Sequence, residues 1–171
     1  MLNLKQNSMS NVYIDLRPHY IFAYSSDSME FGSRQLLFYN KKDKSLHYKK
    51  EPGMFEVDSE EAKEFTLPIS DEKADVIKEM FRLMIETFNS YPGEPWFVLD
   101  GSECVVICGK KRIRFQGPCF DEPFGSFYNA ANHLCQAVEG TGEESFEDVM
   151  SEVKEASRVL QEHLSEYTKN E

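Results

Sequence analysis

Long apolar runs and regular cysteine spacings are both missing from this sequence of 171 residues. No segment approaches the roughly 20 consecutive apolar residues that a membrane-spanning helix requires. The opening stretch MLNLKQNSMSNVYIDL contains neither the apolar core nor the small-residue cleavage site of a secretory signal. The four cysteines are irregularly spaced, which does not resemble a disulfide framework. We therefore expect a cytoplasmic protein with no membrane partner.

Motifs of the common phosphate-binding and hydrolytic sites are also missing. Gly101, Gly109 and Gly117 are separated by strand-like segments, so they are typical of turns and not of a loop that opens a helix. No G-x-S-x-G nucleophile elbow is present. His133 and Cys135 are two residues apart on an expected helix, where their side chains point in different directions. The sequence therefore predicts no catalytic residue and no cofactor. An enzyme whose site is assembled from distant residues stays an alternative.

The cysteine spacing argues against a zinc site. Cys104 and Cys108 share one face of an expected strand, where four residues separate their Cα atoms by about 13 Å. Two thiolates on one zinc ion lie much closer together, because each sulfur is about 2.3 Å from the metal. Cys119 and Cys135 are isolated in the sequence. We predict that the thiols are reduced, that Cys104 and Cys108 face a core, and that no metal is bound.

Acidic residues are in clear excess over basic ones. The chain has 30 Asp and Glu against 19 Lys and Arg, which gives a net charge of −11. Such a charge disfavours non-specific binding to nucleic acid or anionic membrane and favours a basic partner. The length and the 13% of aromatic residues suffice for the core of one domain. We expect a flexible leader over residues 1–10 and a single domain over 11–171.

Strand-like and helix-like patterns alternate along the chain. The strand-like segments are 12–26, 34–40, 45–51, 63–69, 96–100, 103–108 and 111–117. Pro18 interrupts the first segment, which predicts either an edge strand with a break there or two short strands. The KKDK stretch at 41–44 predicts a hairpin turn, and the last three segments predict an antiparallel meander.

Apolar residues at helical spacing predict three helices, over 71–89, 125–138 and 145–167. Ser70 has the side chain that an N-cap requires, and Asp71 and Glu72 follow in the first turn, where the helix dipole favours anions. The order of strands, helix, strands, helix, helix favours an α+β fold. We expect an antiparallel sheet of about five to seven strands packed against about three helices.

The last expected helix carries most of its charge on one face. An acidic face is usually only solvated, but it can also be complementary to a cationic partner. The partner-binding candidates on this helix are Glu147, Asp148, Glu152, Glu155 and Glu162. The next candidate is the loop at 119–125, because aromatic residues beside acids can anchor a partner. Its candidates are Phe120, Asp121, Glu122 and Phe124.

Basic residues gather at two expected hairpins. The residues concerned are Lys41, Lys42 and Lys44 at the first, and Lys110, Lys111, Arg112 and Arg114 at the second. If the hairpins lie side by side, with Tyr39, Tyr48 and Phe115 nearby, they form a sheet-based site for nucleic acid or a phospholigand. Lysines at turns and edges also simply keep a sheet soluble. The net charge of the chain favours this second interpretation.

The segment WFVLDGSECVVICGKKRIRFQG, followed by a proline-containing loop and SFYNAANHLCQAV, resembles a pattern in small uncharacterised bacterial proteins. In that pattern a strand ends in Asp-Gly, two strands follow, and a helix closes the unit. Some of these proteins are immunity proteins of bacterial toxin systems. Taken with the acidic charge and the absence of catalytic motifs, the resemblance favours a non-enzymatic inhibitor that neutralises a cognate, basic protein. The resemblance supplies no catalytic residues.

Overall fold

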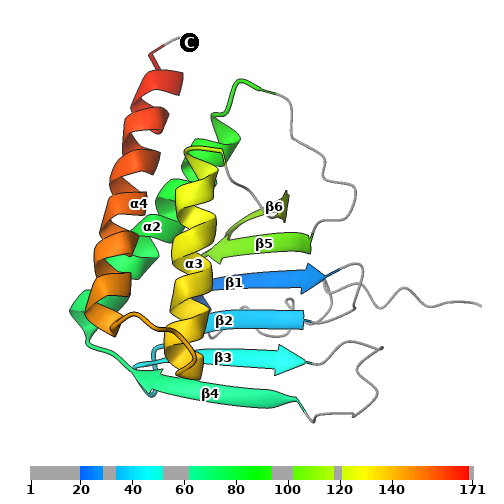
Figure 1. The fold of residues 1–171 in the computed structure, drawn as a ribbon. Helices are drawn as coiled ribbons and strands as arrows, with labels where there is room; N and C mark the ends of the chain where they lie inside the picture. The colour runs from blue at the N-terminus through cyan, green and yellow to red at the C-terminus, as the bar shows by residue number, and fades with distance from the viewer. Residues whose placement is uncertain (1–19, 29–33, 52–61, 94–101, 118–120, 170–171) are drawn as a thin grey trace, which may run out of the picture.

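The protein consists of a six-stranded antiparallel sheet with three helices over one face (Figure 1). The computed structural model describes residues 20–28, 34–51, 62–93, 102–117 and 121–169. The strands are β1 (Tyr20–Ser28), β2 (Arg34–Asn40), β3 (Ser45–Glu51), β4 (Lys63–Pro68), β5 (Ser102–Cys108) and β6 (Lys111–Gly117). The helices are α2 (Asp71–Asn89), α3 (Phe124–Glu139) and α4 (Phe146–Tyr167). The predicted α+β class is confirmed.

The strand order, β4-β3-β2-β1-β5-β6, places β1 in the middle of the sheet. Of the two alternatives expected for this segment, an edge strand is therefore wrong for residues 20–26. Phe22 and Tyr24 are buried on the helix face and Ala23 on the opposite face, and a strand buried on both faces belongs inside a sheet. The break expected at Pro18 and the leader over 1–10 lie outside the described residues.

The meander predicted for 96–117 is wrong in its first pairing. β5 pairs with β6 on one side, as expected, but its other neighbour is β1. Both edges of β5 are thus occupied by described strands, and residues 96–100 lie outside the described ranges. The hairpin of β2 and β3 around the 41–44 turn is confirmed. β4 extends the sheet beyond it.

Serine residues cap the starts of α2 and α4. The side chain of Ser70 accepts a hydrogen bond from the backbone N–H of Lys73 at 3.2 Å, and α2 starts at the next residue. Ser145 and Asp148 form a capping box at the start of α4. α3 ends at Gly140, whose φ of 78° lies in the left-handed region that favours glycine.

The helices form two layers above the sheet. α2 packs against β1, β5 and β6, α3 packs against β3 and β4, and α4 lies across both helices. The core between helices and sheet is rich in aromatic rings: Phe81 of α2 contacts Phe22 at a centroid distance of 4.8 Å and Phe127 at 5.3 Å. None of the helices in the described ranges combines the length and apolar character that crossing a bilayer requires.

Candidate functional site

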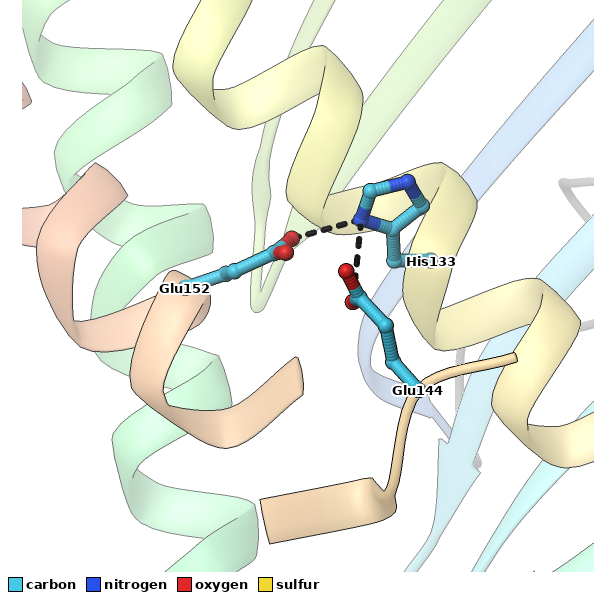
Figure 2. Close-up of side chains that lie close together, drawn as sticks. All are labelled: His133, Glu144 and Glu152. Carbon is cyan, nitrogen blue, oxygen red and sulfur yellow. Dashed lines mark hydrogen bonds and ion pairs between the residues drawn. The ribbon is translucent and has the colours of Figure 1, made fainter. Parts of the chain in front are cut away.

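The connection between α3 and α4 brings one histidine and two carboxylates together (Figure 2). His133 comes from the middle of α3, Glu144 from the turn before α4, and Glu152 from the second turn of α4. Nδ1 of His133 lies 2.6 Å from Oε2 of Glu152 and 3.7 Å from Oε2 of Glu144. One ligand atom from each residue lies within 4.8 Å of the other two. We call these three residues the His133 cluster.

The two carboxylates of the His133 cluster affect each other's ionisation. The pKa of Glu144 is raised, first by a hydrogen bond with Glu152 and then by partial desolvation, while His133 acts in the opposite direction. Nδ1 of His133 and Oε2 of Glu152 share a hydrogen bond, whose direction depends on the tautomer of the imidazole ring. The side chains of His133, Glu144 and Glu152 are 37%, 46% and 35% exposed, so the cluster is accessible to solvent.

A cavity of about 310 Å³ lies beside the cluster. His133 and Glu144 line it together with Gln136 and Thr141. Imidazole and carboxylate are both ligands for divalent transition metals. The cluster is therefore able to hold a cation while the cavity leaves space for water around it.

The cluster is not apparent in the sequence because its members belong to different elements. In the sequence, His133 lies near Cys135, and Glu152 belongs to an acidic helix face. One signal was available: His133 and Glu152 lie equally far from the two ends of the Gly140–Ser145 connection. Two helices joined by a short loop are antiparallel neighbours, so residues at equal distances from that loop lie level with each other.

The remaining acidic candidates on α4 all have partners within the protein. Glu155 and Glu162 each accept hydrogen bonds from Arg158, at 2.5 Å. Glu147 is paired with Lys73 of α2, and Asp148 belongs to the N-terminal capping box. The hydrogen bonds from Arg158 lower the pKa of Glu155. Each of these carboxylates therefore has a hydrogen-bond or ion-pair partner within the protein, although Glu155 and Glu162 share the single guanidinium of Arg158.

A groove between α2 and α4 carries acidic residues that are not neutralised in this way. It has a volume of about 670 Å³ and is lined by Glu72, Asp75, Val76, Glu79, Lys154 and Ser157. Glu79 is paired with Arg82, but Glu72 and Asp75 form no ion pair with any described residue. We call this surface the α2–α4 groove. Its lining thus has two carboxylates without a described ion-pair partner, one carboxylate paired with Arg82, and the ammonium group of Lys154.

The loop before α3 provides fewer candidates than expected. The prediction that Phe124 is an exposed anchor is wrong: it is the first residue of α3 and is only 2% exposed. Its ring packs edge-on against Phe88 and Tyr91, at centroid distances of 5.9 and 5.4 Å. Asp121 and Glu122 are exposed, and Glu122 accepts a hydrogen bond from Ser126. Phe120 lies outside the described residues.

The two basic hairpins lie at the same end of the sheet. β2 and β5 are both antiparallel to β1, so their following turns leave the sheet on the same side, with β1 between them. The cations are mixed with acids, because Lys44 pairs with Asp71, Lys111 with Glu86 and Arg114 with Glu103. Lys41, Lys42 and Lys110 are exposed, whereas Arg112 is half-buried.

The aromatic residues expected beside the basic hairpins do not form a stacking surface. Tyr39, Tyr48 and Phe115 are 2%, 2% and 7% exposed and belong to the core beneath the helices. Their rings are therefore not available to stack on nucleic-acid bases, which is the main source of affinity in sheet-based readers of single strands.

The cysteines in the described ranges face the core, as predicted. Cys104 and Cys135 are buried and Cys108 is half-buried, and all three are free thiols. Burial raises the pKa of the Cys108 and Cys135 thiols, which keeps them protonated and poorly reactive. Cys119 lies outside the described residues.

Comparison with known proteins identifies no relative: no protein-family model matches the chain, and no curated protein matches it.

Proposed function

We propose that the protein is a non-enzymatic binding module of the immunity or inhibitor type, which neutralises a cognate basic protein through the α2–α4 groove. The observation that carries this proposal is the contrast between two acidic surfaces. The carboxylates on α4 are paired internally, whereas Glu72 and Asp75 in the groove have no described ion-pair partner.

The chemistry of the groove suits a lysine or arginine side chain of a partner. Glu72 and Asp75 are exposed on one face of α2, and half-buried Val76 provides an apolar contact for the methylene groups of such a side chain. The net charge of −11 attracts a basic protein over a longer range, which speeds encounter. The groove is thus the candidate binding site for a basic protein that the net charge attracts.

The test compares two variants with the same change in charge. Glu72→Gln combined with Asp75→Asn removes two charges from the groove, and Glu155→Gln combined with Glu162→Gln removes two from the outer face of α4. The partner to use is a basic protein that this chain binds, sought first among the products of neighbouring genes. Association and dissociation rates are measured for each variant across a salt series.

We expect the groove variant to associate more slowly, with a weaker dependence on salt, and the α4 variant to resemble the parent protein. Exposed substitutions of this kind usually change stability by about 0.5 kcal/mol or less, so thermal unfolding serves as the folding control. Equal association of the parent and the groove variant would remove the groove from the interface.

A further inference from the structure

We infer that His133, Glu144 and Glu152 bind a divalent cation of the zinc class, which ties α3 to the start of α4. This inference is independent of the proposed binding of a basic protein, and it replaces the expectation from the cysteine spacing that no metal is bound. It rests on the directions of the three side chains, on the distances between their ligand atoms, and on the cavity beside them (Figure 2).

The distances between the ligand atoms are close to those expected around one tetrahedral metal ion. Ligand atoms at about 2.0–2.1 Å from a tetrahedral zinc ion lie about 3.3 Å from one another. The Nδ1–Glu152 distance of 2.6 Å and the Nδ1–Glu144 distance of 3.7 Å lie on either side of this value. Rotations of the two flexible glutamate side chains, each partly exposed, are sufficient to bring all three atoms to one ion.

The direction of the imidazole ring separates this cluster from an ordinary ion pair. Both carboxylates approach the same nitrogen, Nδ1, and Figure 2 shows the other ring nitrogen directed away from them. An ion bound there takes the place of the Nδ1 proton. It also neutralises two carboxylates that now face each other.

His47 provides an internal contrast, because it also contacts two carboxylates. Asp43 lies 2.8 Å from Nε2 of His47, and Glu64 lies 3.2 Å from Nδ1. The two acids therefore approach different nitrogens, so one ion is unable to contact all three side chains. His47 has the same residue types as His133 but not the geometry of a metal site, which makes it a matched control.

The surroundings leave one coordination position for water. Three protein ligands are one fewer than a closed structural zinc site has. The cavity of about 310 Å³ beside His133 and Glu144 has ample space for that water. Since the ligands come from α3, the connecting turn and α4, a bound ion closes the helical hairpin at its base.

The experiment measures zinc binding to the metal-free full chain by isothermal titration calorimetry, with thermal unfolding in parallel. The variants are His133→Ala and Glu152→Gln, the second of which keeps the size of the side chain and a hydrogen bond to His133. The controls are His47→Gln and Glu143→Gln, because Glu143 lines the same cavity without belonging to the cluster. Circular dichroism of every metal-free variant checks the fold.

We expect one zinc ion per chain in the parent and in both controls, with a rise in melting temperature on adding zinc. His133→Ala should weaken binding by more than about 100-fold, because loss of even a residue that only orients a ligand costs 10- to 100-fold. Glu152→Gln should remove the zinc-dependent rise in melting temperature. Absence of binding to the parent, or equal binding to the parent and the folded His133→Ala variant, would overturn the inference.

Discussion

Oε2 of Glu152 on α4 lies 2.6 Å from Nδ1 of His133 on α3, and this contact joins the most acidic helix of the protein to its neighbour. Glu147, also on α4, forms an ion pair with Lys73 of α2. Carboxylates that appear from the sequence to be solvated therefore contact neighbouring helices. The carboxylates without a described ion-pair partner, Glu72 and Asp75, lie instead in the groove between α2 and α4.

The left-handed residue at the end of α3 should be sensitive to substitution. Gly140 has a φ of 78°, where a Cβ atom is strained, so Gly140→Ala should destabilise the fold by about 1–2 kcal/mol. Gly142 is a matched control, because an added Cβ would only reach ordinary contact with Gln136 at 3.5 Å. Urea unfolding of the two variants checks this, and an equal loss of stability in both would contradict it.

A buried hydroxyl connects α2 to α4. Oγ1 of Thr87, which is fully buried, donates a hydrogen bond to the carbonyl of Leu160 at 3.2 Å. Thr87→Val keeps the shape but loses this bond, so we expect a loss of about 1 kcal/mol in the free energy of unfolding. Thr141→Val, at an exposed site, should change stability little. A Thr87→Val protein as stable as the parent would show that the bond contributes nothing.

Asp71 should contribute stability that depends on pH. The hydrogen bond from Lys44, 2.7 Å long, holds the pKa of Asp71 below its usual value, and Tyr39 acts in the same direction. A carboxyl group with a lowered pKa in the folded state stabilises the fold above the unfolded-state pKa of about 3.9. That contribution is lost as the pH falls through the folded-state pKa.

Unfolding by urea across a pH series tests this contribution. The difference in stability between the parent and Asp71→Asn should be constant near neutral pH and should shrink below about pH 4. Glu72→Gln removes a carboxylate from the same helical turn without breaking a described ion pair, so it is the control. A difference that stays the same down to low pH would contradict the assignment.

The basic hairpins should not create affinity for nucleic acid. Lys44 and Lys111 are paired with acids, and the nearby rings are buried. We therefore expect no salt-sensitive binding of single-stranded RNA or DNA. Replacing Lys41, Lys42, Lys110 and Lys111 with Gln should leave association with the basic protein partner unimpaired. Measurable nucleic-acid affinity that this variant loses would favour the alternative function.

Features encoded by neighbouring residues were predictable from the sequence. Ser70 and Ser145 mark the helix starts because capping is a local interaction, and the apolar spacing of α4 specifies its buried face. The central position of β1 was not predictable, because its partners β2 and β5 are separated from each other by more than a third of the chain. Local patterns contain no information about such pairings.

The candidate sites also combine local features, which the sequence predicts, with contacts between distant elements, which it does not. The acidic excess is visible in the composition, but whether a carboxylate is paired depends on contacts such as Lys73 with Glu147 between distant helices. Phe124 was misjudged because its acidic neighbours suggested exposure, whereas its ring fills the space beside Phe88. Similarly, the His133 cluster exists only after α3 and α4 have packed together.

The central claim is that the chain neutralises a basic protein through the α2–α4 groove, and growth of cells that express both proteins tests it most directly. A basic protein that this chain binds should arrest growth when it is expressed alone. Co-expression of the parent chain, or of the Glu155→Gln, Glu162→Gln variant, should restore growth. The Glu72→Gln, Asp75→Asn variant, at equal abundance, should restore it poorly. Failure of the parent chain to restore growth, or equal rescue by the groove variant, would contradict the account.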